Sequence, residues 1–221
     1  MLSSARISLW NRARRCPVSQ VKGLYNSQLA LFDKPVAEAP ILAVDLEMTG
    51  LNPASDHLLS IGWVPIGGNK VIVEEANHLY IHSNRAVGDS ATIHGITDSA
   101  RLQGLSPKRV MEQFLQAAAG KMLLFHHAQL DLAFINKVFQ VGFGCGFKPA
   151  VIDTMQLQKK ILLRRSDAIA QGALRLPACR TFYNLPHYSG HNALVDALAT
   201  AELFLAITSN RRREKLYRLI S

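Results

Sequence analysis

Two carboxylates at the end of an apolar run are the first candidates for chemistry in this sequence. Residues 41–44 read ILAV, and Asp45 and Glu47 follow two positions apart. A short apolar run that ends in polar residues is typical of a buried strand, in which residues i and i+2 point to the same side. The two carboxylates would therefore repel each other unless a cation lies between them. Two solvated acids at a strand end are the alternative, and this stretch alone leaves both open.

Two further acids fall in the first turns of predicted helices. Asp131 follows the apolar run 122–125, and Asp196 follows Asn192, a favourable N-cap residue. The helix dipole stabilises acids in the first turn, so a purely structural role is the alternative for either one. Both helices are predicted to begin beside strand ends with apolar neighbours. This placement favours a site where the acids meet a counter-charge.

Four carboxylates without a cysteine ligand favour Mg²⁺ or Mn²⁺ rather than zinc. Two such ions about 3.5–4 Å apart form the arrangement that displaces a phosphoryl group in line. The reaction then needs a base for the attacking water, and an imidazole with a pKa of about 6.5 suits that role. His191 stands ahead of the helix that carries Asp196 and is one of 8 histidines. Only its position in the sequence favours His191 over the other histidines as this base.

The apolar patterns predict elements that would position these residues. Strands are predicted to start at residue 41 and to cover residues 58–65, 70–81, 122–125 and 151–153, and helices to run from 107 to 119, over 130–141, up to 163 and from 193 onward. The last helix is expected to bury a stripe of Leu194, Leu198, Ala201 and Leu205. Three strands followed by helices that alternate with two more strands predict an α/β fold. Its centre would be a mixed five-stranded sheet flanked by helices.

Composition limits the classes of protein and partner. The chain of 221 residues is 48% hydrophobic, with a net charge of +9 and a pI of about 9.7. The charge favours a polyanion such as nucleic acid, and no apolar run approaches the roughly 20 residues of a membrane helix. The 3 cysteines have no CxxC spacing, which indicates reduced thiols rather than a disulfide framework or a zinc knuckle.

The charge distribution predicts three regions. Residues 1–38 are rich in Arg and Ser, have no acid before Asp33, and are expected to form a weakly ordered basic N-terminal arm. Residues 39–210 are predicted to form one domain, and residues 211–221 a basic C-terminal end that begins as a solvated helix end. A cytoplasmic location is expected, with mitochondrial targeting by the acid-poor N-terminus as the alternative.

A second basic region is the candidate surface for phosphate contacts. Between residues 159 and 180 a single acid, Asp167, accompanies Lys159, Lys160, Arg164, Arg165, Arg175 and Arg180. A solvated basic face is the alternative.

The order of the acids resembles a known family. Asp45-x-Glu47, then Asp131, then His191-x4-Asp196 is similar to the DEDDh group of 3′–5′ exonucleases on the RNase H-like fold. The segments DLEMTGL, IHGIT, HHAQLDLAFI, IDTMQL and HNALVDALATAELF resemble the family's linking motifs over roughly residues 41–207. In pattern the chain is most similar to the proofreading, epsilon-like exonucleases of bacterial DNA polymerase III.

The resemblance implies a metal-dependent 3′–5′ exonuclease that releases 5′-mononucleotides, with DNA as the expected substrate. In this family pattern Asp45 bridges two Mg²⁺ or Mn²⁺ ions, Glu47 and Asp196 hold the water-bearing ion, and Asp131 holds the other. His191 is the general base. The partners implied are single-stranded or frayed 3′ ends, and a polymerase partner or a homodimer stays open.

The resemblance also implies substrate contacts. Met48, Thr49 and Leu51 would line the pocket of the 3′-terminal nucleotide, and His94 would contact that nucleotide. The second motif departs from the family's usual His-Asn-Ala-x-Phe-Asp, with His127 for Asn and Leu130 for Phe, and Met48 replaces a common Thr. The choice between DNA and RNA is therefore left open.

Three alternatives remain at this point. The spelling DLEMTGL is typical of oligoribonucleases, which degrade short RNA. A non-catalytic RNase H-like module that binds nucleic acid is the second alternative, and a sugar- or nucleotide-phosphate hydrolase with the same two ions is the third.

Overall fold

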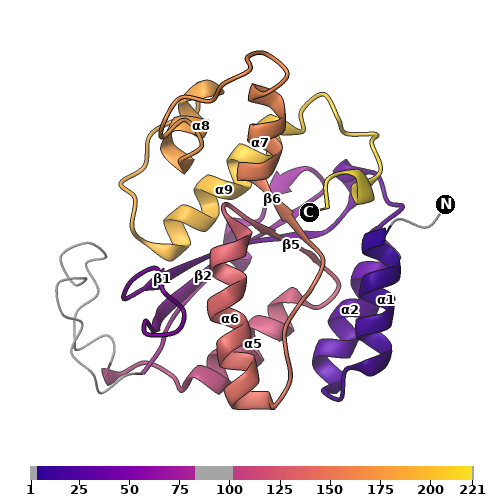
Figure 1. Cartoon of the computed structure of the whole chain (residues 1–221), viewed down its shortest axis with the longest axis vertical. Helices are drawn as coiled ribbons and strands as arrows, with labels where there is room; N and C mark the ends of the chain where they lie inside the picture. The colour runs from indigo at the N-terminus through magenta and orange to yellow at the C-terminus, as the bar shows by residue number, and fades with distance from the viewer. Residues whose placement is uncertain (1–3, 83–101, 221) are drawn as a thin grey trace.

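A mixed sheet forms the centre of the computed structural model, which describes residues 4–82 and 102–220 (Figure 1). The strands are β1 (Ile41–Met48), β2 (Leu58–Gly67), β3 (Lys70–Val71), β4 (Asn77–Tyr80), β5 (Met122–Phe125) and β6 (Val151–Asp153). Their order is β3-β2-β1-β5-β6, and β4 also pairs with β2. β1 is antiparallel to β2 and parallel to β5, and β5 is parallel to β6.

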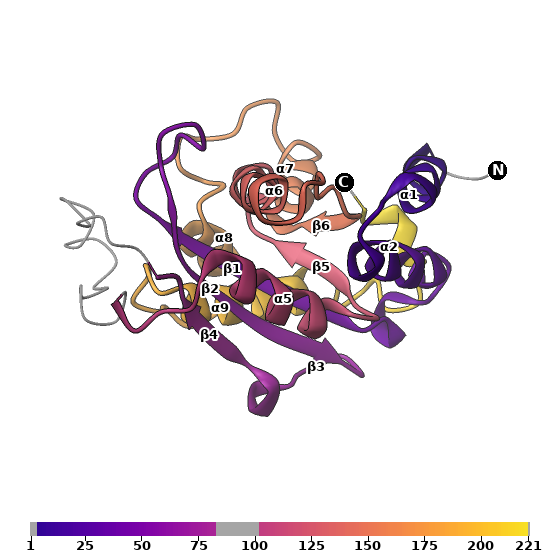
Figure 2. The same cartoon turned by 90° about the horizontal axis from the view of Figure 1, so that it is seen from below.

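Helices cover both faces of this sheet. They are α1 (Ser4–Arg15), α2 (Ser19–Leu31), α5 (Pro107–Ala118), α6 (Ala128–Phe143), α7 (Thr154–Leu162), α8 (Leu176–Phe182) and α9 (Ala193–Ile207), with short 3-10 turns at Val36–Glu38, Val73–Glu75 and Leu216–Arg218. α5 and α6 pack together on one face, and α9 lies across β1 and β2 on the other, together with α7 and α8 (Figures 1 and 2). The predicted three-layer α/β architecture is confirmed.

The predicted strand over residues 70–81 is wrong as a single element. The 3-10 turn Val73–Glu75 divides it into β3 and β4, and both pair with β2. Val73 and the two glutamates of this turn are exposed. Because these side chains are in solvent, no core contact keeps the turn paired with β2, and the chain leaves the sheet edge there.

The expectation of a weakly ordered N-terminal arm is also wrong. α1 and α2 form a helical hairpin that buries Leu9, Leu24, Tyr25 and Phe32 against the main core (Figure 1). The apolar positions recur about one helical turn apart, which gives each helix one inward face while its cations lie outside. The basic composition suggested an exposed arm, although the spacing of the apolar residues is that of amphipathic helices.

The C-terminal end folds back onto this hairpin instead of projecting into solvent. α9 ends at Ile207, Arg211 pairs with Glu214, and Leu216 and Leu219 are buried. The prediction of a solvated helix end at residues 211–213 is wrong in its helix, which ends at Ile207, whereas Arg212 and Arg213 are exposed as predicted.

The buried stripe predicted for α9 needs a similar correction. Leu194, Leu198 and Leu205 are only half-buried. Ala201 is buried as predicted, together with Ala197, which the prediction did not include. At its start, α9 approaches β2 so closely that Gly62 has no room for a side chain, so small residues suit this part of the helix. Within the described residues, no helix combines the length and the apolar character needed to cross a bilayer.

The N-terminal hairpin predicts a measurable contribution to stability. The buried Gln28 amide donates to the Ala150 carbonyl at 2.9 Å and accepts from the Ala150 N–H at 3.0 Å. Replacing Gln28 by Ala leaves both backbone groups buried without partners, so the free energy of unfolding should fall by about 1–3 kcal/mol. Urea denaturation measures the change.

The matched control is Gln20→Ala, an exposed position on the same helix. It should change the free energy of unfolding by less than about 0.5 kcal/mol. Equal stability of the Gln28→Ala and Gln20→Ala proteins would contradict a hairpin that is integral to the core.

Candidate metal centre

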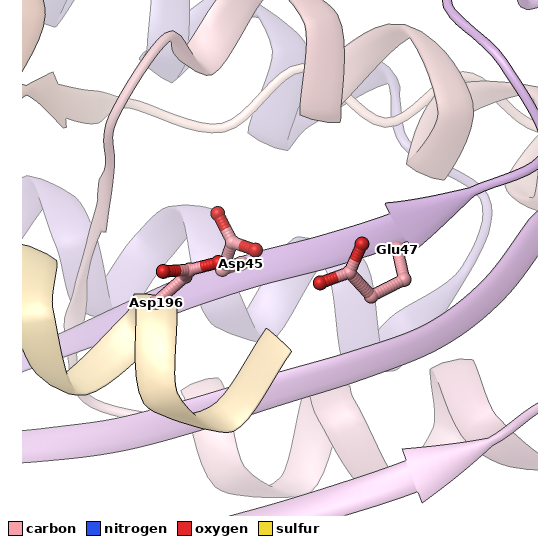
Figure 3. A group of neighbouring side chains, drawn as sticks. All are labelled: Asp45, Glu47 and Asp196. Carbon is pink, nitrogen blue, oxygen red and sulfur yellow. The ribbon is translucent and has the colours of Figure 1, made fainter. Parts of the chain in front are cut away.

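β1 presents two carboxylates on the same side of the sheet. Asp45 pairs with Gly62 of β2 and Glu47 pairs with Ser60, and both side chains project toward α9 (Figure 3). Glu47 is 4% exposed, and Asp45 is half-buried. The pairing register shifts between Glu47 and Met48, so β1 changes course directly after its second acid. The same-side arrangement predicted from the sequence is confirmed.

The first turn of α9 adds a third carboxylate. Asn192 caps this helix, since its side-chain oxygen accepts from the N–H groups of Leu194 at 3.1 Å and Val195 at 3.2 Å. The cap starts the helix so that Asp196 faces the two acids of β1 (Figure 3). Asp45, Glu47 and Asp196 each offer a carboxylate oxygen, and these oxygens lie within 4.8 Å of one another. Hard oxygen donors at this separation fit a divalent cation.

A glycine on β2 permits the close approach of α9. A Cβ atom on Gly62 would lie 2.3 Å from the Leu194 nitrogen and 2.5 Å from the Ala193 carbonyl oxygen. Only a residue without a side chain fits there, because backbone atoms cannot yield as the end of a flexible side chain can. Gly62 is also the partner of Asp45 in the sheet, so it holds the helix and the strand acid in one place.

Asp131 lies beside this group, in the first turn of α6. Its carboxylate is 4% exposed, and its charge is among the causes that raise the pKa of Asp45. Within the described part of the chain, the tight three-residue cluster does not include it. Asp131 thus contributes a fourth negative charge on the edge of the site formed by α6.

Asp153, which the sequence analysis did not select, fixes the start of α6. Its carboxylate accepts from the backbone N–H groups of His127 and Ala128, both at 3.1 Å, and from Met155 N–H at 2.9 Å as the cap of α7. His127 adopts a left-handed conformation with φ of 81°. One carboxylate at the end of β6 therefore joins two helix starts. An acid at a strand end directly before a helix was the available signal in the sequence.

Burial raises the pKa of every acid in the site, and repulsion from neighbouring acids adds to this at Asp45, Glu47 and Asp131. Burial raises the pKa of Glu47 from 4.5 to about 8, with the charge of Asp196 as a second cause. Burial and the nearby acids, Asp131 first among them, hold the pKa of Asp45 well above its ordinary value. The pKa of Asp131 and that of Asp196 are raised mainly by burial. A divalent cation would supply the positive charge that this arrangement requires.

His191 lies at the solvent side of the cluster. It is exposed and has a left-handed φ of 69°, and its backbone N–H donates to Asp196 Oδ2 at 2.9 Å. The main chain of His191 therefore orients one of the acids, while the imidazole belongs to the loop that precedes α9. The structure brings this residue into the neighbourhood that the sequence predicted.

The predicted nucleotide contacts lie at and after the end of β1. Leu51 is 75% exposed, and Met48 and Thr49 are half-buried. The Thr49 hydroxyl accepts from His57 N–H at 2.9 Å and lies 3.3 Å from an Asp56 carboxylate oxygen, so it braces the β1–β2 loop. His94 falls outside the described residues.

The predicted phosphate surface contains one residue with a different role. Arg180 is 3% exposed and bound to protein groups, so it is not available to a phosphate. The remaining cations of this region are exposed and retain that prediction: Lys159, Lys160, Arg164, Arg165 and Arg175.

Comparison with known proteins places this site in a family. A family model described as Exonuclease (RNase T) matches residues 42–204. The chain is 29% identical over 174 residues to the PolC-type DNA polymerase III of Thermotoga maritima, a match over 78% of this chain and 12% of that protein. It is 26% identical to the DNA polymerase III epsilon subunit of Buchnera aphidicola subsp. Schizaphis graminum, over 77% of this chain and 75% of the subunit.

The chain belongs to the RNase T exonuclease family, and the resemblance to epsilon-like DEDDh exonucleases is confirmed. It spans only 12% of the length of the PolC-type relative. Members of this family typically depend on divalent metal ions, which agrees with the acidic cluster.

Solved structures support the fold. The nuclease domain of 3′hExo, a DEDDh family member bound to rAMP, superimposes with a TM-score of 0.68 at 15% identity, over 83% of this chain and 100% of that domain. E. coli exonuclease I in complex with a dT13 oligonucleotide gives 0.64 at 18% identity, over 79% of this chain and 42% of that one. The RNase H-like fold predicted from the sequence is confirmed.

The contact of Gly62 with α9 predicts a position-specific effect. Gly62→Ala should displace the start of α9 and separate Asp196 from the β1 acids, which lowers the free energy of unfolding by about 1–3 kcal/mol and weakens Mn²⁺ binding. Thermal unfolding and calorimetric titration with Mn²⁺ measure the two effects. Gly67→Ala on the same strand is the control, because its Cβ would meet only the flexible end of Ile72 at 3.1 Å. Equal Mn²⁺ affinity in both variants would contradict this role of Gly62.

The raised carboxyl pKa values predict how stability depends on pH. Between the ordinary pKa of Glu47, 4.5, and its folded value of about 8, the unfolded chain has lost a proton that the folded chain retains. Without divalent ions, the free energy of unfolding should therefore fall as pH rises through this window. Added Mn²⁺ should stabilise the protein more at about pH 8 than at about pH 5.5, because bound metal replaces the protons.

Thermal unfolding in EDTA and in Mn²⁺ across this range is the measurement. The variant Glu47→Gln should show a smaller loss of stability with pH in EDTA. An unchanged pH dependence in this variant would contradict the conclusion that the raised pKa of Glu47 causes the loss of stability.

Proposed function

We propose that this chain is a 3′–5′ exonuclease that hydrolyses nucleic acid, with DNA as its main substrate, and releases 5′-mononucleotides. The observation that carries the proposal is the convergence of Asp45, Glu47 and Asp196, with their carboxylate oxygens within 4.8 Å, beside the buried Asp131. Burying like charges together costs free energy, and a divalent cation offsets that cost.

In the proposed mechanism, Asp45, Glu47, Asp196 and Asp131 would hold two divalent ions, Mg²⁺ or Mn²⁺. When bound, such ions supply the positive charge that activates water and stabilises the negative charge developing on a phosphodiester. His191 accepts the proton of the attacking water, and its exposed position in the loop before α9 gives it access to the solvent side of the site. The hydrogen bond of its N–H to Asp196 couples the base to a metal ligand.

The substrate would enter past the β1–β2 loop. The exposed Leu51 lies beyond the end of β1, where it can pack against the terminal base, and Met48 and Thr49 would contact the same nucleotide. The net charge of +9 favours a polyanion. The epsilon and PolC-type relatives suggest a polymerase as partner, and the structures of relatives hold dT13 or rAMP, so DNA and RNA need direct comparison.

The test uses oligonucleotides labelled at the 5′ end, as single-stranded DNA and as the matching RNA, with Mg²⁺, with Mn²⁺ and with EDTA. The full chain should produce a ladder that shortens from the 3′ end, faster on DNA, and no product in EDTA. Asp45→Asn should lower kcat by at least about 10³-fold, because it removes one of the carboxylates that would hold the ions.

Glu74→Gln is the matched control, an exposed acid of the 3-10 turn Val73–Glu75, and it should keep full activity. Equal rates for Asp45→Asn and the unmodified chain would contradict the proposal, as would cleavage that persists in EDTA. Faster degradation of short RNA than of DNA would favour the oligoribonuclease-like alternative.

A further inference from the structure

The loop that carries His191 lacks regular structure but is anchored at its middle. Between α8 and α9 the chain forms no helix or strand over residues 185–192, and its residues from Pro186 to His191 are exposed. A general base on such a segment would sample many positions unless other groups restrict the loop. Two sets of contacts restrict this loop: the hydrogen bond of the His191 N–H to Asp196 at its end, and the contacts of a buried arginine of α8 near its middle.

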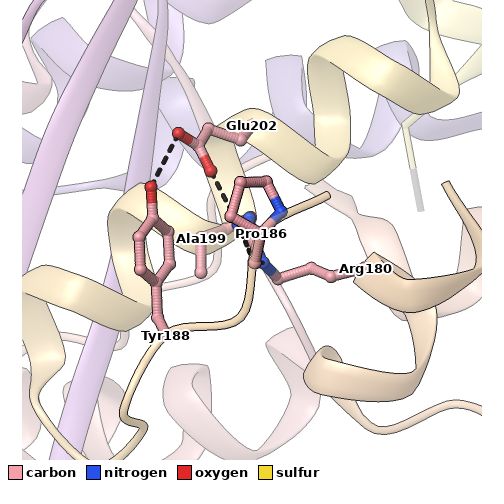
Figure 4. Close-up of polar contacts among 5 residues, drawn as sticks. All are labelled: Arg180, Pro186, Tyr188, Ala199 and Glu202. Atoms are coloured by element: carbon pink, nitrogen blue, oxygen red, sulfur yellow. Dashed lines mark hydrogen bonds and ion pairs between the residues drawn. The ribbon is translucent and has the colours of Figure 1, made fainter. Parts of the chain in front are cut away.

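Arg180 connects this loop to α9. Its Nη2 and Nε groups donate to the Pro186 carbonyl at 2.8 and 3.2 Å, and its Nη1 donates to the Ala199 carbonyl at 2.8 Å. Nη2 also pairs with Glu202 Oε2 at 2.8 Å (Figure 4). The planar guanidinium thus joins the loop backbone, the helix backbone and an acid of α9, a pattern that a lysine ammonium could not reproduce.

Tyr188 ties the loop to α9 a second time. Its hydroxyl donates to Glu202 Oε1 at 3.0 Å, and its ring lies over the Arg180 guanidinium with 4.5 Å from Cζ to the ring centroid (Figure 4). Glu202 therefore accepts from both residues, one at each carboxylate oxygen. Because Glu202 and Asp196 are on the same helix, these contacts fix the position of the loop relative to Asp196.

We propose that Arg180, Glu202 and Tyr188 form a latch that positions His191 over the acidic cluster, with Arg180 as its central positioning residue. The inference rests on the proposed function of His191 as general base. The hydrogen bonds of the latch end on the Pro186 and Ala199 carbonyls and on Glu202, so they act on the loop backbone at Pro186 and Tyr188, while the charge of Arg180 also lowers the pKa of Asp196. Loss of the latch should slow the chemical step and leave the binding of the nucleic-acid strand intact.

The test is a double-mutant cycle with His191. Tyr188→Phe removes one hydroxyl and keeps the ring in place, and it should lower kcat about tenfold with KM unchanged, since a hydrogen bond to a charged group is lost. Arg180→Lys keeps the positive charge but loses the forked contacts, and it should lower kcat on the order of 10²-fold through misplacement of the base. In the His191→Ala background each change should lower kcat by less than about twofold, because no base remains to position.

A second readout is independent of catalysis. Amide hydrogen exchange of residues 184–192 should become faster in Tyr188→Phe, whereas exchange in the core of α9 stays the same. Tyr217→Phe, a partly exposed tyrosine of the 3-10 turn near the C-terminus, is the matched control and should change neither exchange nor kcat.

The possible outcomes distinguish failure of the latch from failure of the proposed exonuclease function. Equal losses of kcat in the presence and absence of His191 would overturn the latch and indicate a merely structural role, as would unchanged exchange of the loop. If the unmodified chain proved inactive as a nuclease while the Tyr188→Phe loop exchanged faster, the proposed function would fail and the mechanical latch would stand.

Discussion

Repulsion among carboxylates at the end of β1 is the constraint on which the rest of the structure depends. Asp45, Glu47 and Asp196 are gathered where burial raises the pKa of each, and Asp131 adds a further negative charge. Such a group is unfavourable in an apolar protein interior unless protons or cations neutralise it. The fold must therefore hold the acids together against their own repulsion. Metal-dependent hydrolases are a class of protein in which this free-energy cost serves a function, because the gathered carboxylates bind the metal ions.

The groups that hold the acids are mostly backbone groups and short side chains. Gly62 lets α9 touch β2, Asn192 starts that helix, and Asp153 fixes the start of α6. Arg180 then fastens the loop before α9 to the helix itself. Each support comes from a different part of the chain, so the geometry of the site is a property of the whole sheet and its two helix layers.

Much of the site could be predicted from sequence because it depends on local rules. The alternation of a strand puts Asp45 and Glu47 on one side, and an Asn cap four residues before Asp196 puts that acid in a first helical turn. Gly62 and Arg180 could not be predicted in this way, because their roles arise from contacts with α9 that no local pattern encodes. The N-terminal hairpin was missed for a different reason: its many arginines suggested solvent exposure, while the spacing of its apolar residues produced a buried face.

Divalent cations bound by the acidic cluster would be located by anomalous diffraction from crystals that contain Mn²⁺. We expect a strong anomalous peak with oxygens of Asp45, Glu47 and Asp196 at about 2.0–2.6 Å, and a second peak on the side of Asp131 when a nucleotide is present. Crystals at about pH 8 with Mn²⁺ bound elsewhere, and no peak among these carboxylates, would contradict this expectation.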